Sequence, residues 1–126
     1  MATGLTLDSG ALIAAEKGDR RFWALWKEAL DRGATVTVPA GIVAQVWRGN
    51  NAVIARILEG CDVEPLTEER AKQVGRLLAS ARSSDVIDAS VVIGAAARRD
   101  AVVTSDPSDI DRLARSLRYK LTVVSI

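Results

Sequence analysis

The chain has 126 residues, of which 48 % are hydrophobic and 26 % charged, proportions typical of one soluble globular domain. Its 17 basic and 16 acidic residues give a net charge of +1, so no overall field indicates binding to nucleic acid. The sequence has no histidine and one cysteine, which excludes histidine-dependent hydrolases, histidine-ligated zinc, internal disulfides and cysteine-rich metal sites.

The same composition limits the chemistry that the chain can perform. Cys61 lies in an apolar stretch and is interpreted as a small packed side chain rather than a nucleophile. A hydrolase without histidine or a reactive cysteine depends on carboxylates and a metal ion. No run of 18 apolar residues is present, and the N-terminus lacks the segments of a secretory signal, so we expect a cytoplasmic protein.

Short apolar runs alternate with helical patterns along the chain. In the first half the pattern predicts strands at 3–8 and 35–38 and helices at 9–16, 20–31, 40–48 and 51–59. In the second half it predicts an extended segment at 62–66, helices at 67–79, 85–99 and 107–117, and strands at 101–104 and 121–124. Strands that alternate with helices form parallel sheets covered on both faces. We therefore predict an α/β fold, a three-layer α/β/α sandwich.

Aspartates stand at the ends of two predicted strands and at the start of one helix. Asp8 closes the first apolar run, Asp88 lies in the first turn of helix 85–99, and Asp106 directly follows strand 101–104. Because the carboxyl ends of parallel strands meet at one crevice, we expect these carboxylates to converge. Clustered carboxylates repel one another unless a hard cation such as Mg²⁺ or Mn²⁺ neutralises them. The sequence therefore predicts a metal-dependent phosphoryl-transfer enzyme, most simply a nuclease.

Helix capping is the alternative role for the aspartates of all three segments, beginning with Asp8 and Asp85. Asp8 could cap the following helix for about 1 kcal/mol, although Ser9 could do so equally well. Asp85, with Asp88 three residues later, forms a pair like a capping box. We assign capping to Asp85 and a site role to Asp88, because small residues after Asp88 let this helix approach the sheet closely. These small residues are Ala89, Ser90, Gly94 and Ala95.

The third segment has the same ambiguity. Asp106 could cap the next helix, with Pro107 in its first turn and Asp109 three residues on. Capping explains each segment separately, but it does not explain why all three supply carboxylates to one edge of the sheet.

Two groups of basic residues differ in their expected roles. Arg98 and Arg99 end helix 85–99, where cations suit the helix dipole, and we interpret them as a solvated face. Arg48 follows Gln45 by three residues on the same predicted helix face, which makes it a candidate for contact with RNA.

These segments resemble the PIN-domain ribonucleases, and within them the VapC toxins of bacterial toxin–antitoxin pairs. The resemblance covers nearly the whole chain and is carried by Leu7-Asp8-Ser9, Val38-Pro39-Ala40, Asp88-Ala89 and the segment from Val103 to Ile110. It implies that residues 1–126 form a single PIN-like domain with four or five parallel strands. It also implies a homodimer, cleavage of RNA with Mg²⁺ or Mn²⁺, and a VapB-like antitoxin as partner.

The resemblance also assigns roles to individual residues. It implies that Asp8, Asp88 and Asp106 hold the metal ion, that Asp109 is an outer member of the catalytic set, and that Thr104 places a hydroxyl in the pocket.

One position departs from the family pattern. The family commonly has a glutamate in the helix after the second strand, and the matching residue here is Gln45. An amide can coordinate through its oxygen but cannot neutralise charge or accept a proton. Asp85 or Asp109 could supply the missing charge. The alternative function is a PIN-like module that binds RNA or an antitoxin without efficient cleavage.

Two other acidic α/β families fit less well. A response-regulator receiver needs a phosphoacceptor aspartate after its third strand, and residues 61–66 offer no convincing one. A dehalogenase-like phosphatase needs a second aspartate two residues after Asp8, where Gly10 stands.

Overall fold

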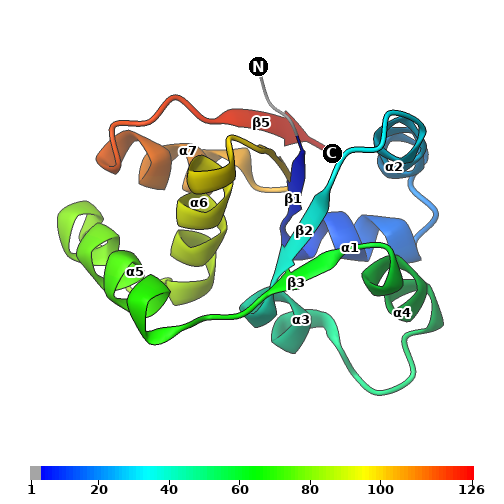
Figure 1. Cartoon of the computed structure of the whole chain (residues 1–126), viewed down its shortest axis with the longest axis horizontal. Coiled ribbons are helices and arrows are strands. Elements are labelled where there is room, and N and C mark those ends of the chain that lie inside the picture. Colours follow the sequence, from blue (N-terminus) through cyan, green and yellow to red (C-terminus); the bar gives the residue numbers. More distant parts are fainter. Residues whose placement is uncertain (1–3) are drawn as a thin grey trace.

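The computed structural model describes residues 4–126, which form a five-stranded, all-parallel sheet and seven helices (Figure 1). The strands are β1 (Leu5–Leu7), β2 (Val36–Pro39), β3 (Asp62–Glu64), β4 (Ala101–Thr104) and β5 (Thr122–Ser125). The helices are α1 (Ser9–Glu16), α2 (Arg20–Asp31), α3 (Ala40–Val46), α4 (Ala52–Glu59), α5 (Glu68–Ala81), α6 (Val86–Arg98) and α7 (Pro107–Ser116). The prediction of an α/β fold with five parallel strands is confirmed.

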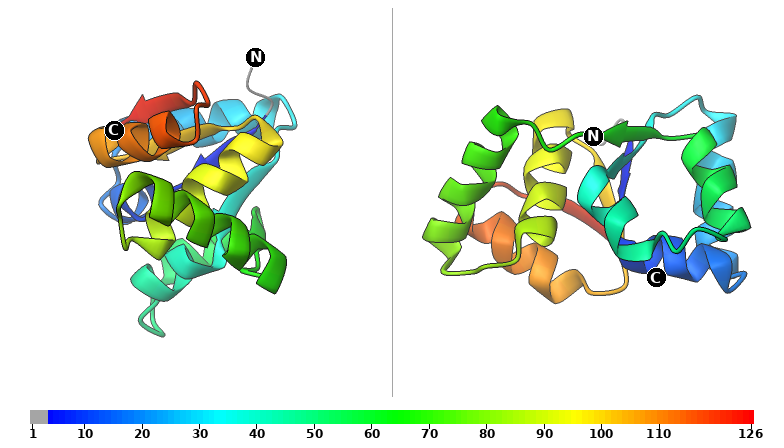
Figure 2. Two further views of the ribbon diagram at one scale, coloured as in Figure 1. Left: turned by 90° about the vertical axis from the view of Figure 1, so that its left-hand side faces the viewer. Right: turned by 90° about the horizontal axis from the view of Figure 1, so that it is seen from below.

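The helices form two layers with the sheet between them. Figure 1 and the view from below in Figure 2 show α1, α2 and α4 on one side of the strands and α5, α6 and α7 on the other. Helix α3 lies below the ends of the strands and contacts α1, α6 and β2. No helix of residues 4–126 has the length and apolar character needed to cross a membrane.

The strand order is β3-β2-β1-β4-β5, with β1 at the centre. The chain leaves β1 into α1 on one face and leaves β4 into α7 on the other, so the connections diverge between these two neighbouring strands. Such a switch point is where open α/β sheets form their ligand crevice. The order also differs from the 2-1-3-4-5 order of response-regulator receivers, which removes that family as an alternative.

Small residues bring α6 close to the sheet, as the sequence predicted. Every residue from Ala89 to Ala95 is buried, and α6 contacts β1, β2 and β4. Asp85 begins this helix as its N-cap, since its Oδ1 accepts a hydrogen bond of 2.9 Å from the backbone N–H of Asp88. This contact stabilises the first turn of α6 and sets the residue at which the helix begins.

The interpretation of Arg98 as part of a solvated face is wrong. Its guanidinium is half-buried and forms ion pairs with Glu64 and with Asp100, the latter at 2.9 Å, and it also donates to the Thr6 hydroxyl at 2.9 Å. Gly94 makes room for this network, because a Cβ there would lie 2.6 Å from a carboxylate oxygen of Glu64. The network ties α6 to β1, β3 and the start of β4.

The predicted helix 40–48 extends two residues too far. Helix α3 ends at Val46, because Trp47 adopts an extended backbone conformation with ψ of 129°. The side chain of Arg48 turns back and donates to the carbonyl oxygens of Gln45 and Trp47, both at 2.8 Å. These bonds satisfy carbonyl groups that the end of a helix leaves without an intrahelical partner.

Candidate metal centre

Asp8 lies at the switch point, directly after β1. Its backbone N–H donates to the carbonyl of Val103 at 3.0 Å, and its side chain is only 6 % exposed. Oδ1 accepts a hydrogen bond of 2.8 Å from the backbone N–H of Ser9, so Asp8 does cap α1. Oδ2 accepts a second bond of 2.7 Å from the hydroxyl of Thr104. Both carboxylate oxygens are therefore held in fixed directions.

Thr104 connects Asp8 to the turn that follows β4. Besides donating to Asp8, its Oγ1 accepts a hydrogen bond of 3.0 Å from the backbone N–H of Asp106. The same turn lies against the start of α1, because a Cβ on Gly10 would collide with the side chain of Ser105. The Thr104 hydroxyl therefore links the end of β1 to the turn that follows β4.

Asp106 occupies the N-cap position of α7, but its side chain makes no capping hydrogen bond to the backbone. Its Oδ1 instead accepts a bond of 3.1 Å from the hydroxyl of Ser108, and the residue is exposed. Capping therefore does not explain this carboxylate. Ser108 was not singled out from the sequence, although its position two residues after an aspartate is the signal that could have identified it.

Asp88 lies in the first turn of α6 and is half-buried, whereas Asp85 before it is exposed. Burial, followed by the negative charges of Asp85, Asp8 and Asp109, raises the pKa of Asp88 from 3.8 to about 7. Four carboxylates from three separate segments of the chain therefore act on one another at the carboxyl edge of the sheet.

No basic side chain balances this cluster. In residues 4–126, none of the carboxylates of Asp8, Asp85, Asp88, Asp106 and Asp109 forms an ion pair with lysine or arginine. Asp109 is exposed in the first turn of α7. The edge therefore holds negative charge that the described protein does not neutralise.

The cluster fits a divalent cation in charge and in donor type, since carboxylate and hydroxyl oxygens are the ligands that Mg²⁺ and Mn²⁺ prefer. The charges of Asp85, Asp8 and Asp109, which add to the effect of burial in raising the pKa of Asp88, would favour a cation here. Within residues 4–126, however, no three acidic or cysteine side chains are gathered closely enough to hold one ion as they stand. A cation held by Asp8, Asp88 and Asp106 together would therefore require side chains such as that of the exposed Asp106 to move.

Gln45 and Arg48 lie on and just beyond α3, the helix below the strand ends (Figure 1). Both are exposed, and in the described part of the chain the amide of Gln45 makes no hydrogen bond to protein. Arg48 uses two of its five donors on the end of α3, which leaves donors for a phosphate.

Cys61 takes no part in this cluster. Burial, and then the charge of Asp62, raise the pKa of the Cys61 thiol to about 12. A thiol that stays protonated at neutral pH is a poor nucleophile, which agrees with its interpretation as a packed side chain.

The chain matches no model of a known protein family and gives no significant match to a curated protein sequence. The resemblance to PIN-domain ribonucleases therefore remains an expectation based on the segments quoted above.

Proposed function

We propose that the protein is a Mg²⁺- or Mn²⁺-dependent endoribonuclease of the PIN-domain VapC type, the toxin of a toxin–antitoxin pair. One observation carries the proposal: at the switch point of a parallel sheet, burial and then the carboxylates of Asp85, Asp8 and Asp109, none of them ion-paired within residues 4–126, raise the pKa of Asp88 to about 7. Acidic edges of this kind suit metal-assisted hydrolysis of a phosphodiester.

In this proposal Asp8, Asp88 and Asp106 hold the cation, and Asp109 is an outer catalytic member. A bound Mg²⁺ would neutralise the cluster and stabilise charge at the scissile phosphate. The Ser9 N–H and the Thr104 hydroxyl keep the Asp8 carboxylate oriented. Because the pKa of Asp88 lies near 7, this side chain can gain or lose a proton in the neutral range before cation binding.

The proposed partners come from the resemblance to VapC toxins, and the charge distribution indicates where each would bind. Arg48 would contact the RNA backbone through the guanidinium donors that α3 does not use. A VapB-like antitoxin would inhibit the enzyme by placing a positive side chain in the acidic pocket. The toxin itself would act as a cytoplasmic homodimer.

A second candidate function is a PIN-like module that binds RNA or antitoxin with little or no cleavage. Two observations favour it: Gln45 stands where the family commonly has glutamate, and the acidic side chains are not gathered into a ready metal site. Such a module would bind its partner equally well with or without divalent metal.

Incubation of the purified protein with total RNA, with Mg²⁺, Mn²⁺ or chelator, tests the proposal. We expect metal-dependent cleavage that Asp88→Asn abolishes. Asp62→Asn is the matched control, because it removes an exposed aspartate at the start of β3, at the other end of the parallel strands. Cleavage that persists in chelator or in Asp88→Asn would contradict a metal-dependent nuclease at this edge.

A further inference from the structure

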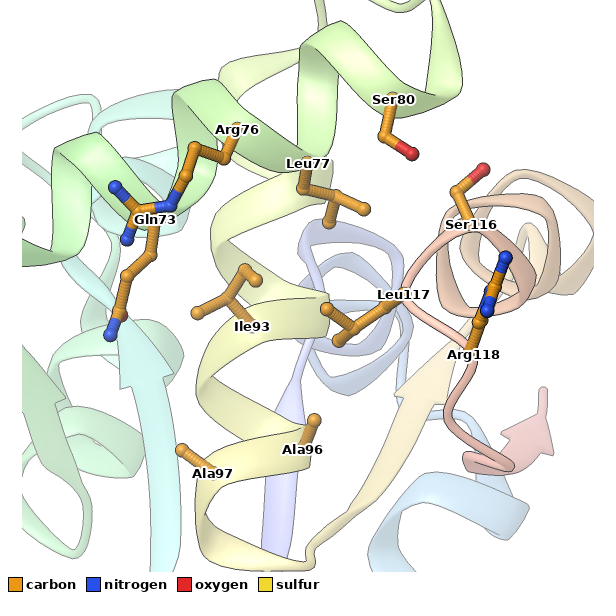
Figure 3. A pocket seen from close by; sticks show the side chains of 10 residues that line it. All are labelled: Gln73, Arg76, Leu77, Ser80, Ile93, Ala96, Ala97, Ser116, Leu117 and Arg118. Atoms are coloured by element: carbon orange, nitrogen blue, oxygen red, sulfur yellow. The ribbon is translucent and has the colours of Figure 1, made fainter.

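An open groove lies between α5, α6 and the end of α7, in the helical layer that contains α6 (Figure 3). Its volume is about 570 Å³, within the range of roughly 300 to 1,000 Å³ that is usual for small-molecule sites. The groove borders the second half of α6, whereas Asp88 lies in the first turn of the same helix. It is therefore separate from the acidic cluster.

The floor of the groove is apolar. Leu77 of α5, Ile93 of α6 and Leu117 after α7 point into it, as Figure 3 shows. The groove is open because α6 presents only the methyl groups of Ala96 and Ala97 between its two neighbours. Leu77 and Ile93 are already buried, so the apolar surface that an occupant would remove from water belongs mainly to Leu117, Ala96 and Ala97.

Positive charge borders this floor. The guanidinium groups of Arg76 on α5 and Arg118 after α7 lie on opposite sides of the floor in Figure 3. Within residues 4–126 neither side chain forms an ion pair or a hydrogen bond, and no acidic residue is among those that line the groove. Two free guanidinium groups facing an apolar floor complement an occupant with acidic groups at both ends.

We propose that this groove binds a small dianionic amphiphile, a molecule whose apolar body lies on Leu77, Ile93 and Leu117 and whose acidic ends pair with Arg76 and Arg118. The acidic ends are carboxylates or phosphates, because both match the planar donor fork of arginine. Ser80 on α5 and Ser116 on α7, which lie on the Arg118 side of the groove in Figure 3, provide hydroxyl donors for the end that pairs with Arg118. This inference does not depend on the proposed nuclease activity.

Calorimetric titration of the full chain with decanedioate, decanoate and 1,10-decanediol tests the proposal. All three probes share an apolar body of the same length and differ in the number of charged ends. We expect decanedioate to bind about tenfold more tightly than decanoate, since one charge-assisted pair is lost, and decanediol more weakly still. Bis-phosphate esters of decanediol, compared with decanedioate, distinguish a phosphate from a carboxylate preference.

Two variants locate the binding. Arg76→Gln and Arg118→Gln should each weaken decanedioate binding about tenfold, whereas Arg112→Gln, an exposed arginine of α7 outside the groove, should not. Methyl NMR signals of Leu77, Ile93 and Leu117 should shift on titration. Equal binding of the diol, no binding, or unchanged affinity in both groove variants would overturn the proposal. A dimer that dissociates in the double variant would assign the groove to a second copy of the chain, and would also overturn it.

Discussion

The hydroxyl of Thr104 donates a 2.7 Å hydrogen bond to Oδ2 of Asp8, which joins the ends of two neighbouring strands across 96 residues of sequence. Both residues are buried, so this bond gives the Thr104 hydroxyl proton an acceptor and Oδ2 of Asp8 a donor inside the protein. The bond fixes the direction in which the Asp8 carboxylate presents its oxygens. Its removal should therefore affect both stability and metal binding.

Thr104→Val keeps the shape of the side chain and removes the hydroxyl. We expect a loss of roughly 1 to 3 kcal/mol in the free energy of unfolding, because a buried carboxylate oxygen and the Asp106 N–H both lose a partner. Thr104→Ser retains the hydroxyl and should recover most of the Mn²⁺ affinity lost in Thr104→Val. Urea unfolding and calorimetric Mn²⁺ titration measure the two effects. Equal Mn²⁺ affinity in both variants would show that the bond does not orient the Asp8 carboxylate.

Asp88 should make the metal-free protein less stable as the pH rises. Its folded pKa of about 7 lies above the 3.8 of an unperturbed aspartate, so the folded state binds the proton more tightly. This stabilisation is complete below about pH 4 and is lost as the pH rises through about 7. Urea unfolding in chelator should show a decrease of roughly 1 kcal/mol over this window, allowing for screening of a half-exposed group.

Asp88→Asn should remove this pH dependence and leave the metal-free protein as stable as, or more stable than, the wild type at pH 8. Asp62→Asn, the exposed control, should keep the wild-type profile. If the free energy of unfolding of Asp88→Asn still falls between about pH 4 and about pH 7, groups other than Asp88 cause the pH dependence.

Gln45→Glu restores the charge that the family pattern has at this position, with almost no change in volume. If Gln45 faces the acidic edge, divalent-metal affinity and RNA cleavage should both increase, because one more carboxylate attracts the cation. Mn²⁺ calorimetry and a cleavage assay on both forms provide the measurement. Unchanged affinity together with unchanged activity would show that Gln45 lies outside the site.

Arg98→Met should separate stability from function. Loss of the guanidinium leaves the buried Asp100 without its ion-pair partner and Glu64 with Arg70 alone, which should cost roughly 2 to 4 kcal/mol in the free energy of unfolding. Metal affinity of the folded protein should not change, because Arg98 lies at the other end of α6 from Asp88. Thermal melts and Mn²⁺ titration of the folded variant test both statements.

Local sequence patterns, such as helix-capping residues and short apolar runs, were enough to predict most of the helices and strands. Thr67 caps α5 and Asp85 caps α6, each through a hydrogen bond to a backbone N–H three residues later. The alternation of these helices with apolar runs also predicted the parallel sheet. Asp8 and Asp88 were expected at one edge because parallel strands end together, and the charge interaction between them agrees with that expectation.

What the sequence did not reveal depends on partners distant in the chain. Arg98 seemed to be a solvated helix end, but its partners Glu64 and Thr6 are 34 and 92 residues away. No local pattern specifies such pairs. The end of α3 was missed for a different, local reason, since the side chain of Arg48 competes with further helical turns for the carbonyl groups of Gln45 and Trp47.

The central position of β1 has a consequence for synthesis of the chain. Asp8 is made about a hundred residues before the nearby Asp109, and its neighbour in the sheet, β4, is also made long after it. A nascent chain still attached to the ribosome therefore cannot assemble the acidic pocket until residue 109 has emerged. In the proposed nuclease, the cation site would therefore form only after these residues are made, which would protect the ribosome and messenger from cleavage until then.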